Sequence, residues 1–363
     1  MSDATARPSH RSAPRLLVAA SGTGGHLFPA IALAEQLSDY HIEWLGVPDR
    51  LETQLVPKQY PLHTIRVEGF QSRSIKAVKV LFRLISGIFQ VRSLLKQGNF
   101  QGVVTTGGYI AGPAILAARS LGLPVILHES NALPGKVTRW LSPWCTKVAL
   151  GFDTSSQYLP RAHTVCVGTP VRPDFLTPPS LNLPIPPEAF LIVVVGGSQG
   201  AVALNRLVRQ VAPVWLEAGA WIVHLTGDSD PEADTLHHPR YLVMPFYPHM
   251  SALFHRANLA LSRAGAGTLT ELAVTQTPSI LVPYPFAAED HQAFNAAVFG
   301  AAGAGIVCRQ GDLTPDLLRD KVLHLMNSPE VLAEMAQRCQ DLAEPDSAAQ
   351  LATLVRQTLA ARA

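Results

Sequence analysis

The sequence predicts an α/β protein made of two Rossmann-like domains, whose parallel sheets face each other across a cleft. Three observations predict this fold class. Apolar, strand-like runs alternate with helix-like periods along the chain, which is typical of parallel βα units. Two glycine-rich segments, SGTGGH at 21–26 and GGSQGA at 196–201, each follow such a run. Seven prolines from Pro170 to Pro187 separate the two halves, and we place the domain boundary there.

Each expected strand is a run of Val, Ile and Leu that ends at a polar or glycine-rich turn. The expected strands cover 15–20, 102–107, 124–129, 190–197, 221–227, 259–265 and 279–285. The expected helices cover 31–37, 110–122, 202–219 and 268–274. Because parallel strands all point the same way, the loops after their carboxyl ends are expected to form the functional site.

The proline-rich stretch defines the predicted domain organisation. Proline fixes the backbone φ and lacks an N–H, so we expect residues 171–188 to be a linker without regular elements. The first domain is then 15–170 and the second is 189–335. Residues 1–14 are polar and are expected to be a disordered tail, and 336–363 a helix that packs back toward the first domain.

The composition supports two well-packed cores and limits the partners. Of the 363 residues, 47% are hydrophobic and only 15% are charged, which excludes a disordered chain. The net charge of +2 gives no reason to expect nucleic acid. The first apolar run is far shorter than the roughly 20 residues of a membrane span. Four scattered cysteines without a CxxC pair indicate reduced thiols.

The glycine loops match neither a dinucleotide fingerprint nor a P-loop. Gly22 and Gly24 fit the G-x-G of the dinucleotide fingerprint, but Leu27 stands where its third glycine belongs. The fingerprint also expects an acidic residue about 20 positions further on, and Glu43 meets this expectation only loosely. Neither loop carries GK[ST]. Both would present backbone N–H groups at a helix N-terminus, which suits phosphate or developing negative charge. The pair therefore predicts a diphosphate-bearing substrate, and simple tight turns are the alternative.

His26 follows the first loop, and Pro29 suits the first turn of the next helix. The positive end of a helix dipole favours a neutral imidazole, which can accept a proton from a sugar hydroxyl. We therefore expect His26 to act as a general base. The alternative is a histidine that caps or packs.

The second half carries three polar segments of interest. In 261–273, Thr268 and Glu271 fit a capping box, or Glu271 binds a ribose diol. Arg263 before them either meets a phosphate or is an ordinary exposed arginine. The segment 283–296 gathers carboxylates and amides of the kind that hydroxyl recognition needs, namely Glu289, Asp290, His291, Gln292 and Asn295. The Asp-x-Asp of 227–234 is read as a solvated loop, and no metal is expected.

A basic stretch lies between Gly69 and His128, which holds seven Lys and Arg and no acidic residue. Within 70–96 an apolar stripe of Ile75, Val78, Phe82, Ile85 and Phe89 runs beside a basic stripe of Arg73, Lys76, Lys79 and Arg83. This pattern is typical of a helix on an anionic membrane surface. The alternative is a core-packed helix with a solvated edge. The expected membrane contacts are Ile75, Lys76, Lys79, Phe82 and Arg83.

Seven motifs in order resemble the MurG family of cell-wall N-acetylglucosaminyltransferases, in glycosyltransferase family 28. They are GTGGHLFPA, TTGGYIAGP, HESNALPGK, GTPVR, GGSQGA, SRAGAGTLTEL and PYPFAAEDHQAFNA. The resemblance covers nearly the whole chain after the first 14 residues. It implies the GT-B fold, the donor UDP-N-acetylglucosamine (UDP-GlcNAc) and no cofactor. It also implies a polyprenyl-diphosphate-linked muramyl-pentapeptide acceptor, lipid I, and peripheral attachment at the cytoplasmic face of the inner membrane.

The resemblance further implies roles for single residues. Thr23, Gly24 and Gly25 would touch the transferred sugar and the acceptor diphosphate, with His26 as base or acceptor-orienting group. The implied donor-binding residues are Asn131, Arg172, Ser198, Tyr247, Ala266, Gly267, Thr268, Leu269, Thr270, Glu271 and Gln292. Of these, Ser198 would meet the donor phosphates, the Tyr247 backbone uracil, and Gln292 the sugar hydroxyls. Ala293 stands where a second glutamine is common, which removes one sugar contact.

The predicted reaction is an inverting, metal-independent transfer of N-acetylglucosamine to the 4-hydroxyl of the muramyl sugar, which gives lipid II for peptidoglycan synthesis. The backbone amides at Ser198–Gln199 would stabilise the negative charge on the departing UDP. Three alternatives stay open. They are a related transferase with another lipid acceptor, an isomerase of the UDP-GlcNAc 2-epimerase type, and a non-catalytic UDP-sugar-binding protein. The basic segment argues against the isomerase.

Overall fold

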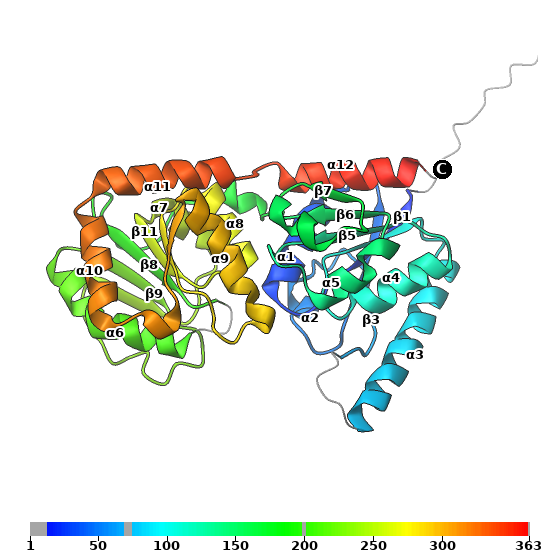
Figure 1. Cartoon of the computed structure of the whole chain (residues 1–363), viewed down its shortest axis with the longest axis horizontal. Coiled ribbons are helices and arrows are strands. Elements are labelled where there is room, and N and C mark those ends of the chain that lie inside the picture. Colours follow the sequence, from blue (N-terminus) through cyan, green and yellow to red (C-terminus); the bar gives the residue numbers. More distant parts are fainter. Residues whose placement is uncertain (1–12, 69–74, 198–200, 362–363) are drawn as a thin grey trace, which may run out of the picture.

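The computed structural model of the chain describes residues 13–68, 75–197 and 201–361, with the backbone alone for 75–79. Within these residues the chain forms two α/β domains, each built on one parallel sheet (Figure 1). In both sheets the strand order runs outward in both directions from the first strand, which is the doubly wound arrangement of Rossmann-like domains. The predicted fold class is confirmed.

The first domain has a seven-stranded sheet with the order β3-β2-β1-β4-β5-β6-β7. Its strands are β1 (Arg15–Ala19), β2 (His41–Gly46), β3 (Leu62–Thr64), β4 (Gly102–Thr105), β5 (Val125–Glu129), β6 (Lys147–Leu150) and β7 (Thr164–Cys166). Its helices are α1 (Gly24–Gln36), α2 (Glu52–Leu55), α3 (Ile75–Gln97), α4 (Ala111–Ser120) and α5 (Lys136–Leu141), with the 3₁₀ turns η1 (Ser142–Trp144) and η2 (Asp153–Tyr158).

The second domain has a six-stranded sheet with the order β10-β9-β8-β11-β12-β13. Its strands are β8 (Leu191–Val195), β9 (Trp221–Leu225), β10 (Tyr241–Met244), β11 (Leu259–Ser262), β12 (Ser279–Leu281) and β13 (Gly305–Val307). Its helices are α6 (Val202–Glu217), α7 (Met250–Arg256), α8 (Ala266–Val274), α9 (His291–Ala302) and α10 (Pro315–Met326), with the 3₁₀ turns η4 (Ala288–Asp290) and η5 (Gln310–Asp312).

Helices cover both faces of each sheet, so each domain has two core layers. In the first domain α3 and α4 bury one face, and α1 buries the other. In the second domain α6 and α10 bury one face, and α7, α8 and α9 the other. Burial on both faces explains why β1 and β8 are continuous apolar runs, because neither strand has a side that meets water.

The linker differs from the expectation that its prolines exclude regular structure. One 3₁₀ turn, η3 (Pro173–Phe175), forms within it, and Pro173 stands in its first turn. Proline is compatible with that position because its N–H would be unpaired there in any case. Phe175 is completely buried in the core of the second domain, so this part of the linker is anchored.

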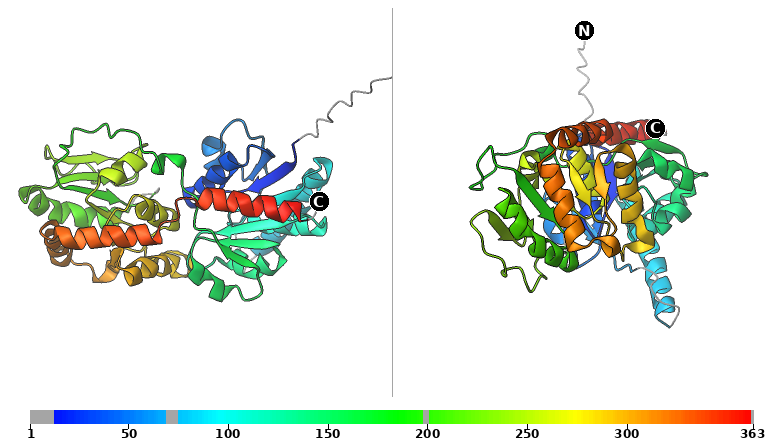
Figure 2. Two further views of the ribbon diagram at one scale, coloured as in Figure 1. Left: turned by 90° about the horizontal axis from the view of Figure 1, so that it is seen from above. Right: turned by 60° about the vertical axis from the view of Figure 1, so that its left-hand side comes forward.

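The C-terminal segment also differs from the single helix expected over 336–363. Helix α11 (Pro329–Leu342) packs on α8 and α9 of the second domain, and α12 (Ser347–Ala360) packs on α1 of the first. Pro345 separates them because proline cannot continue a helix. Both helices lie along one side of the molecule and bridge the two domains (Figures 1 and 2).

Candidate active site

The two domains meet through loops at the carboxyl ends of their strands. Asn295 of α9 joins them: its Oδ1 accepts from the backbone N–H of Ala132 at 2.8 Å, and its Nδ2 donates to Asn131 Oδ1 at 3.1 Å. Helix α1 of the first domain also contacts α8 of the second. The N-termini of these two helices follow the two glycine-containing loops after β1 and β11, so both loops border the domain junction.

The first glycine loop turns sharply into α1. Gly22 has φ +107°, a left-handed backbone that favours glycine, and Thr23 is the N-cap residue. The Thr23 side chain makes no capping hydrogen bond, so the first-turn N–H groups at Gly24 and Gly25 are available to a ligand. Glu52 of α2 holds this loop in place. The sequence interpretation missed this residue. This buried carboxylate accepts from Gly22 N at 3.3 Å and from Val47 N at 2.7 Å.

The His26 ring lies against the loop after β4. Its Nδ1 is 2.7 Å from the carbonyl oxygen of Thr106, and the Thr106 hydroxyl donates to the His26 carbonyl at 2.9 Å. A carbonyl can only accept, so Nδ1 carries the proton, and in the neutral ring the lone pair is on Nε2. Gly107, in the same loop, has φ +94°, a left-handed backbone that favours glycine. This tautomer is the one that a general base requires.

The loop after β5 is organised by Glu129, another residue that the sequence interpretation missed. Its buried carboxylate accepts from the backbone N–H groups of Asn131 at 3.0 Å and Gly135 at 3.1 Å, and from the Thr138 hydroxyl at 2.7 Å. The Asn131 side chain donates to Glu129 at 3.0 Å and accepts from Asn295. The amide of Asn131 therefore keeps one N–H and one lone pair for a ligand.

The N-terminus of α8 is uncapped. The helix begins at Ala266 with Gly265 as N-cap, and no side chain makes a capping hydrogen bond, so the capping-box alternative for Thr268 and Glu271 is wrong. A Cβ on Gly265 or Gly267 would meet nothing within 4 Å. The predicted nucleotide residues 266–271 are the first six residues of this helix. Leu269 is fully buried and its N–H donates to the Gly265 carbonyl at 3.0 Å, so neither its side chain nor its N–H is open to a ligand.

Glu271 lies within electrostatic range of Arg172 and Asp174. Burial raises the pKa of Glu271 to about 7, the positive charge of Arg172 opposes that shift, and Asp174 adds to it. The Arg172 Cζ is 4.9 Å from the centre of the Phe28 ring of α1 and 5.1 Å from the centre of the Phe175 ring of η3. Arg172 therefore connects the linker with the first domain.

Gln292 ties two loops of the second domain together. Its Oε1 accepts from Ala264 N at 3.2 Å and from Tyr284 N at 2.9 Å, which leaves its amide N–H groups for a ligand. The Tyr247 side chain is buried in the core. Both readings of Arg263 are wrong, because it is buried and donates to the Val282 carbonyl at 3.1 Å.

Several other predicted residues lie elsewhere. Ser198 and Gln199 lie outside the described residues. Glu43 is buried in β2, where hydrogen bonds from His63 and Arg15 outweigh the effect of burial and lower its pKa. Asp230 of the Asp-x-Asp segment is buried rather than solvated, and it binds Arg209 at 2.7 Å. Among the described residues, no group of three or more His, Cys, Asp and Glu side chains is placed to hold a metal ion.

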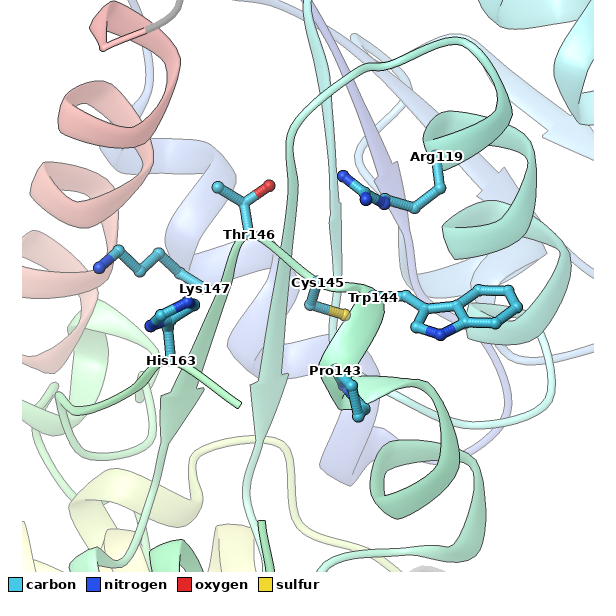
Figure 3. A pocket seen from close by; sticks show the side chains of 7 residues that line it. All are labelled: Arg119, Pro143, Trp144, Cys145, Thr146, Lys147 and His163. Carbon is cyan, nitrogen blue, oxygen red and sulfur yellow. The ribbon is translucent and has the colours of Figure 1, made fainter. Parts of the chain in front are cut away.

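A cavity of about 440 Å³ lies away from this junction. It is lined by Arg119, Pro143, Trp144, Cys145, Thr146, Lys147 and His163 (Figure 3). Lys147 begins β6 and His163 precedes β7, so the cavity is at the amino edge of the sheet, opposite to the candidate active site.

The basic segment forms α3, which leaves an apolar face uncovered. Val91 and Leu95 are buried, but Phe82 is 72% and Phe89 66% exposed. Arg83 pairs with Glu68. The side chains of Ile75, Lys76 and Lys79 lie outside the described residues. None of the helices in the described part of the chain is long and apolar enough to cross a membrane.

Two parallel-sheet domains whose glycine-containing helix starts meet at one junction have the GT-B architecture. The fold alone does not define the reaction, so the class of enzyme is taken from the sequence matches. Residues 16–150 match the glycosyltransferase family 28 N-terminal domain, and residues 191–351 match the family 28 C-terminal domain. The chain belongs to glycosyltransferase family 28 and, within it, to the MurG family. The predictions of the family and of a glycosyltransferase are confirmed.

One relative is the UDP-N-acetylglucosamine–N-acetylmuramyl-(pentapeptide) pyrophosphoryl-undecaprenol N-acetylglucosamine transferase of Nostoc sp. strain PCC 7120. It is 66% identical over 349 residues, which cover 95% of this chain and 98% of the relative. The crystal structure of Acinetobacter baumannii MurG is 31% identical with a TM-score of 0.78, over 95% of this chain and 99% of that one. A UDP-N-acetylglucosamine 2-epimerase structure from Listeria monocytogenes is 11% identical (97% of this chain, 98% of that one; TM-score 0.70) and shares the fold alone.

Proposed function

We propose that this glycosyltransferase moves N-acetylglucosamine from UDP-GlcNAc to the 4-hydroxyl of the muramyl sugar of lipid I, which gives lipid II for peptidoglycan synthesis. The carrying observation is the His26 ring at the start of α1, whose Nδ1 is fixed on the Thr106 carbonyl and whose Nε2 has no hydrogen-bond partner among the described residues. The high identity to the Nostoc transferase supports the same donor and acceptor.

The chemistry follows from these groups. The acceptor 4-hydroxyl attacks the anomeric carbon, His26 Nε2 takes its proton, and the bond from that carbon to UDP breaks with inversion. Helix-start N–H groups stabilise the charge that develops on the diphosphate. Thr23, Gly24 and Gly25 are assigned to the acceptor diphosphate and the transferred sugar, and no metal is required.

The donor belongs to the second domain in this proposal. The start of α8 and Glu271 hold the nucleotide, Gln292 donates to the sugar hydroxyls, and Asn131 and Arg172 contribute from the other side of the junction. Ser198 meets the donor phosphates and the backbone of Tyr247 meets uracil. Residues 15–170 then form the acceptor domain, and 189–335 the donor domain.

The acceptor is a membrane lipid, so the proposal includes contact with an anionic membrane surface, at the cytoplasmic face of the inner membrane. The exposed apolar face of α3, with Phe82, Ile85 and Phe89, supports this contact. The absence of acidic residues between Gly69 and His128 supports it as well, because like charges would be repelled.

The first experiment measures UDP release from UDP-GlcNAc with and without a short-chain lipid I analogue. The expected result is release that depends on the analogue, together with the disaccharide product. Release with diacylglycerol instead would favour the transferase with another acceptor. UDP binding without turnover on either lipid would favour a non-catalytic binding protein.

A further inference from the structure

One ion pair joins the two domains beside the candidate active site. Nη2 of Arg139, in α5 of the first domain, lies 2.6 Å from both carboxylate oxygens of Glu289, in η4 of the second. The two side chains are 29% and 35% exposed, so the pair sits at the rim of the junction. The residues are 150 positions apart in the sequence, and the contact forms only when the domains are close together.

The backbone at this pair has an uncommon conformation. Glu289 and Asp290 have φ values of +52° and +57°, in the left-handed region that residues other than glycine adopt uncommonly, although Asp does so more often than Glu. Each carboxylate is held by an arginine. Asp290 Oδ2 lies 2.8 Å from Nη1 of Arg309, which belongs to the same domain. The turn is therefore held from both domains, Glu289 from the first and Asp290 from the second.

Each end of the pair borders a loop of the candidate site. Glu289 precedes Gln292 by three residues, and the Gln292 side chain binds the backbone of Ala264. Arg139 lies in the helix that begins directly after Gly135, whose N–H donates to Glu129. The pair is thus joined to both loops by short segments, and the Arg139 N–H donates to the Gly135 carbonyl at 2.9 Å.

We propose that Arg139 and Glu289 are a positioning pair for sugar transfer, an inference that rests on the proposed function. The pair holds the two domains together at the rim of the junction, and it fixes the left-handed turn that presents the Gln292 amide to the sugar. Neither side chain touches the reacting atoms. Without the pair the turn relaxes and the sugar is no longer held in position. The binding of the nucleotide by α8 is unchanged.

Charge reversal tests the pair. Arg139→Glu and Glu289→Arg are each expected to lower kcat/KM for UDP-GlcNAc about tenfold, and the double variant R139E/E289R to recover to within about threefold of the unchanged protein. The Kd for UDP should be the same in all three. The mismatched double variant R139E/D290R is the matched control and should recover nothing, because Asp290 faces Arg309.

A distance measurement gives a second readout. Cysteines replace the exposed Arg161 and Glu217, one on each domain, in a chain that also carries Cys166→Ser, and both are spin-labelled. In the presence of UDP-GlcNAc, the labelled protein with the Arg139–Glu289 pair intact should give one narrow distribution of label-to-label distances. The labelled R139E variant should give a broader distribution. The proposal is overturned if R139E/E289R is no more active than the single variants, or if R139E leaves the distribution unchanged. If the unchanged protein transfers no sugar, the proposed function is contradicted. The positioning pair is still tested in that case, because the distances between the two spin labels do not depend on turnover.

Discussion

At the scale of single residues, the groups proposed to contact substrate are held in place by neighbouring residues that are not themselves proposed to contact it. The Thr106 carbonyl selects the tautomer of His26, Glu129 orders the loop of Asn131, and Glu52 holds Gly22. All three contacts are hydrogen bonds to backbone or amide groups, which fix geometry without changing the chemistry of the residue that they hold. Catalysis in this site should therefore depend on orientation as much as on residue type.

Replacement of His26 tests the base. His26→Ala is expected to lower kcat by a factor of about 10² to 10⁴, because the 4-hydroxyl then loses its proton to water. The Kd for UDP should not change, since the ring lies at the start of α1 and the nucleotide is assigned to α8. Steady-state kinetics and UDP titration check both. A near-normal kcat would contradict the base assignment.

Glu271 predicts a pH dependence. Its pKa is raised to about 7 in the folded protein, so the ionised carboxylate that binds a ribose diol best forms as pH rises through about 7. The affinity for UDP-GlcNAc should therefore increase as pH rises through that value, and Glu271→Gln should flatten this dependence. Titration of UDP-GlcNAc at a series of pH values measures both.

The same group affects stability with a defined sign. Because the folded pKa lies above the ordinary value of 4.5, the protonated form favours folding, and this contribution is lost as pH rises from about 4.5 through about 7. The free energy of unfolding, measured with denaturant across that window, should fall less steeply in Glu271→Gln. An unchanged slope would contradict the raised pKa.

The sequence points more directly to the residues that are proposed to face a ligand than to those that support them. His26, Gln292 and the start of α8 belong to motifs whose chemistry can be read locally. Glu52 and Glu129 cannot be found in that way, because their partners are backbone N–H groups whose positions exist only in the fold. Arg263 was misread for the same reason, since the carbonyl of Val282 that it binds is supplied by the next strand.

At the scale of elements, the strands that the sequence predicted are those buried on both faces. β1, β4, β5, β8, β9, β11 and β12 are runs of apolar residues. Strand β2 is missed although five of its six residues are buried, because Glu43 interrupts its apolar run. The other missed strands have three or four residues, and none of the three residues of β3 is buried. Such a strand is defined by its pairing with a neighbour, and pairing leaves no apolar pattern in the sequence.

Helix α3 yields a prediction at this scale. Phe82→Ser with Phe89→Ser removes two exposed apolar side chains, and binding to vesicles that contain phosphatidylglycerol should fall about tenfold or more. Leu317→Ser on α10 is the matched control, since Leu317 is exposed but lies on the other domain. Co-sedimentation measures both. Equal binding of the double variant and the control would contradict membrane contact through α3.

At the scale of the whole molecule, the fold class follows from the sequence, but the way the two domains meet does not. The contacts Asn131–Asn295 and Arg139–Glu289 join residues 164 and 150 positions apart. Each of these side chains is polar, and the sequence around it gives no sign that its partner is a residue of the other domain rather than water. Only the placement of both domains brings them together.

Helix α12 makes the stability of the first domain depend on the C-terminal segment of the chain. Leu351 is fully buried in the core layer that contains α1. Leu351→Ala should lower the free energy of unfolding by about 2–5 kcal/mol, and the exposed control Gln350→Ala by less than about 0.5 kcal/mol. Denaturant titration followed by circular dichroism gives both values. Equal stability of the two variants would contradict the packing of α12 on the first domain.

The chain passes between the domains twice, once through the linker and once between α11 and α12. The Ser347 hydroxyl donates to the Thr169 carbonyl at 3.0 Å, so the two passages run side by side. Two adjacent covalent tethers restrict sliding of one body past the other and leave rotation about their common line. The two tethers thus form a hinge between the domains, and the Arg139–Glu289 pair is a separate, non-covalent contact across the same junction that limits rotation about this hinge.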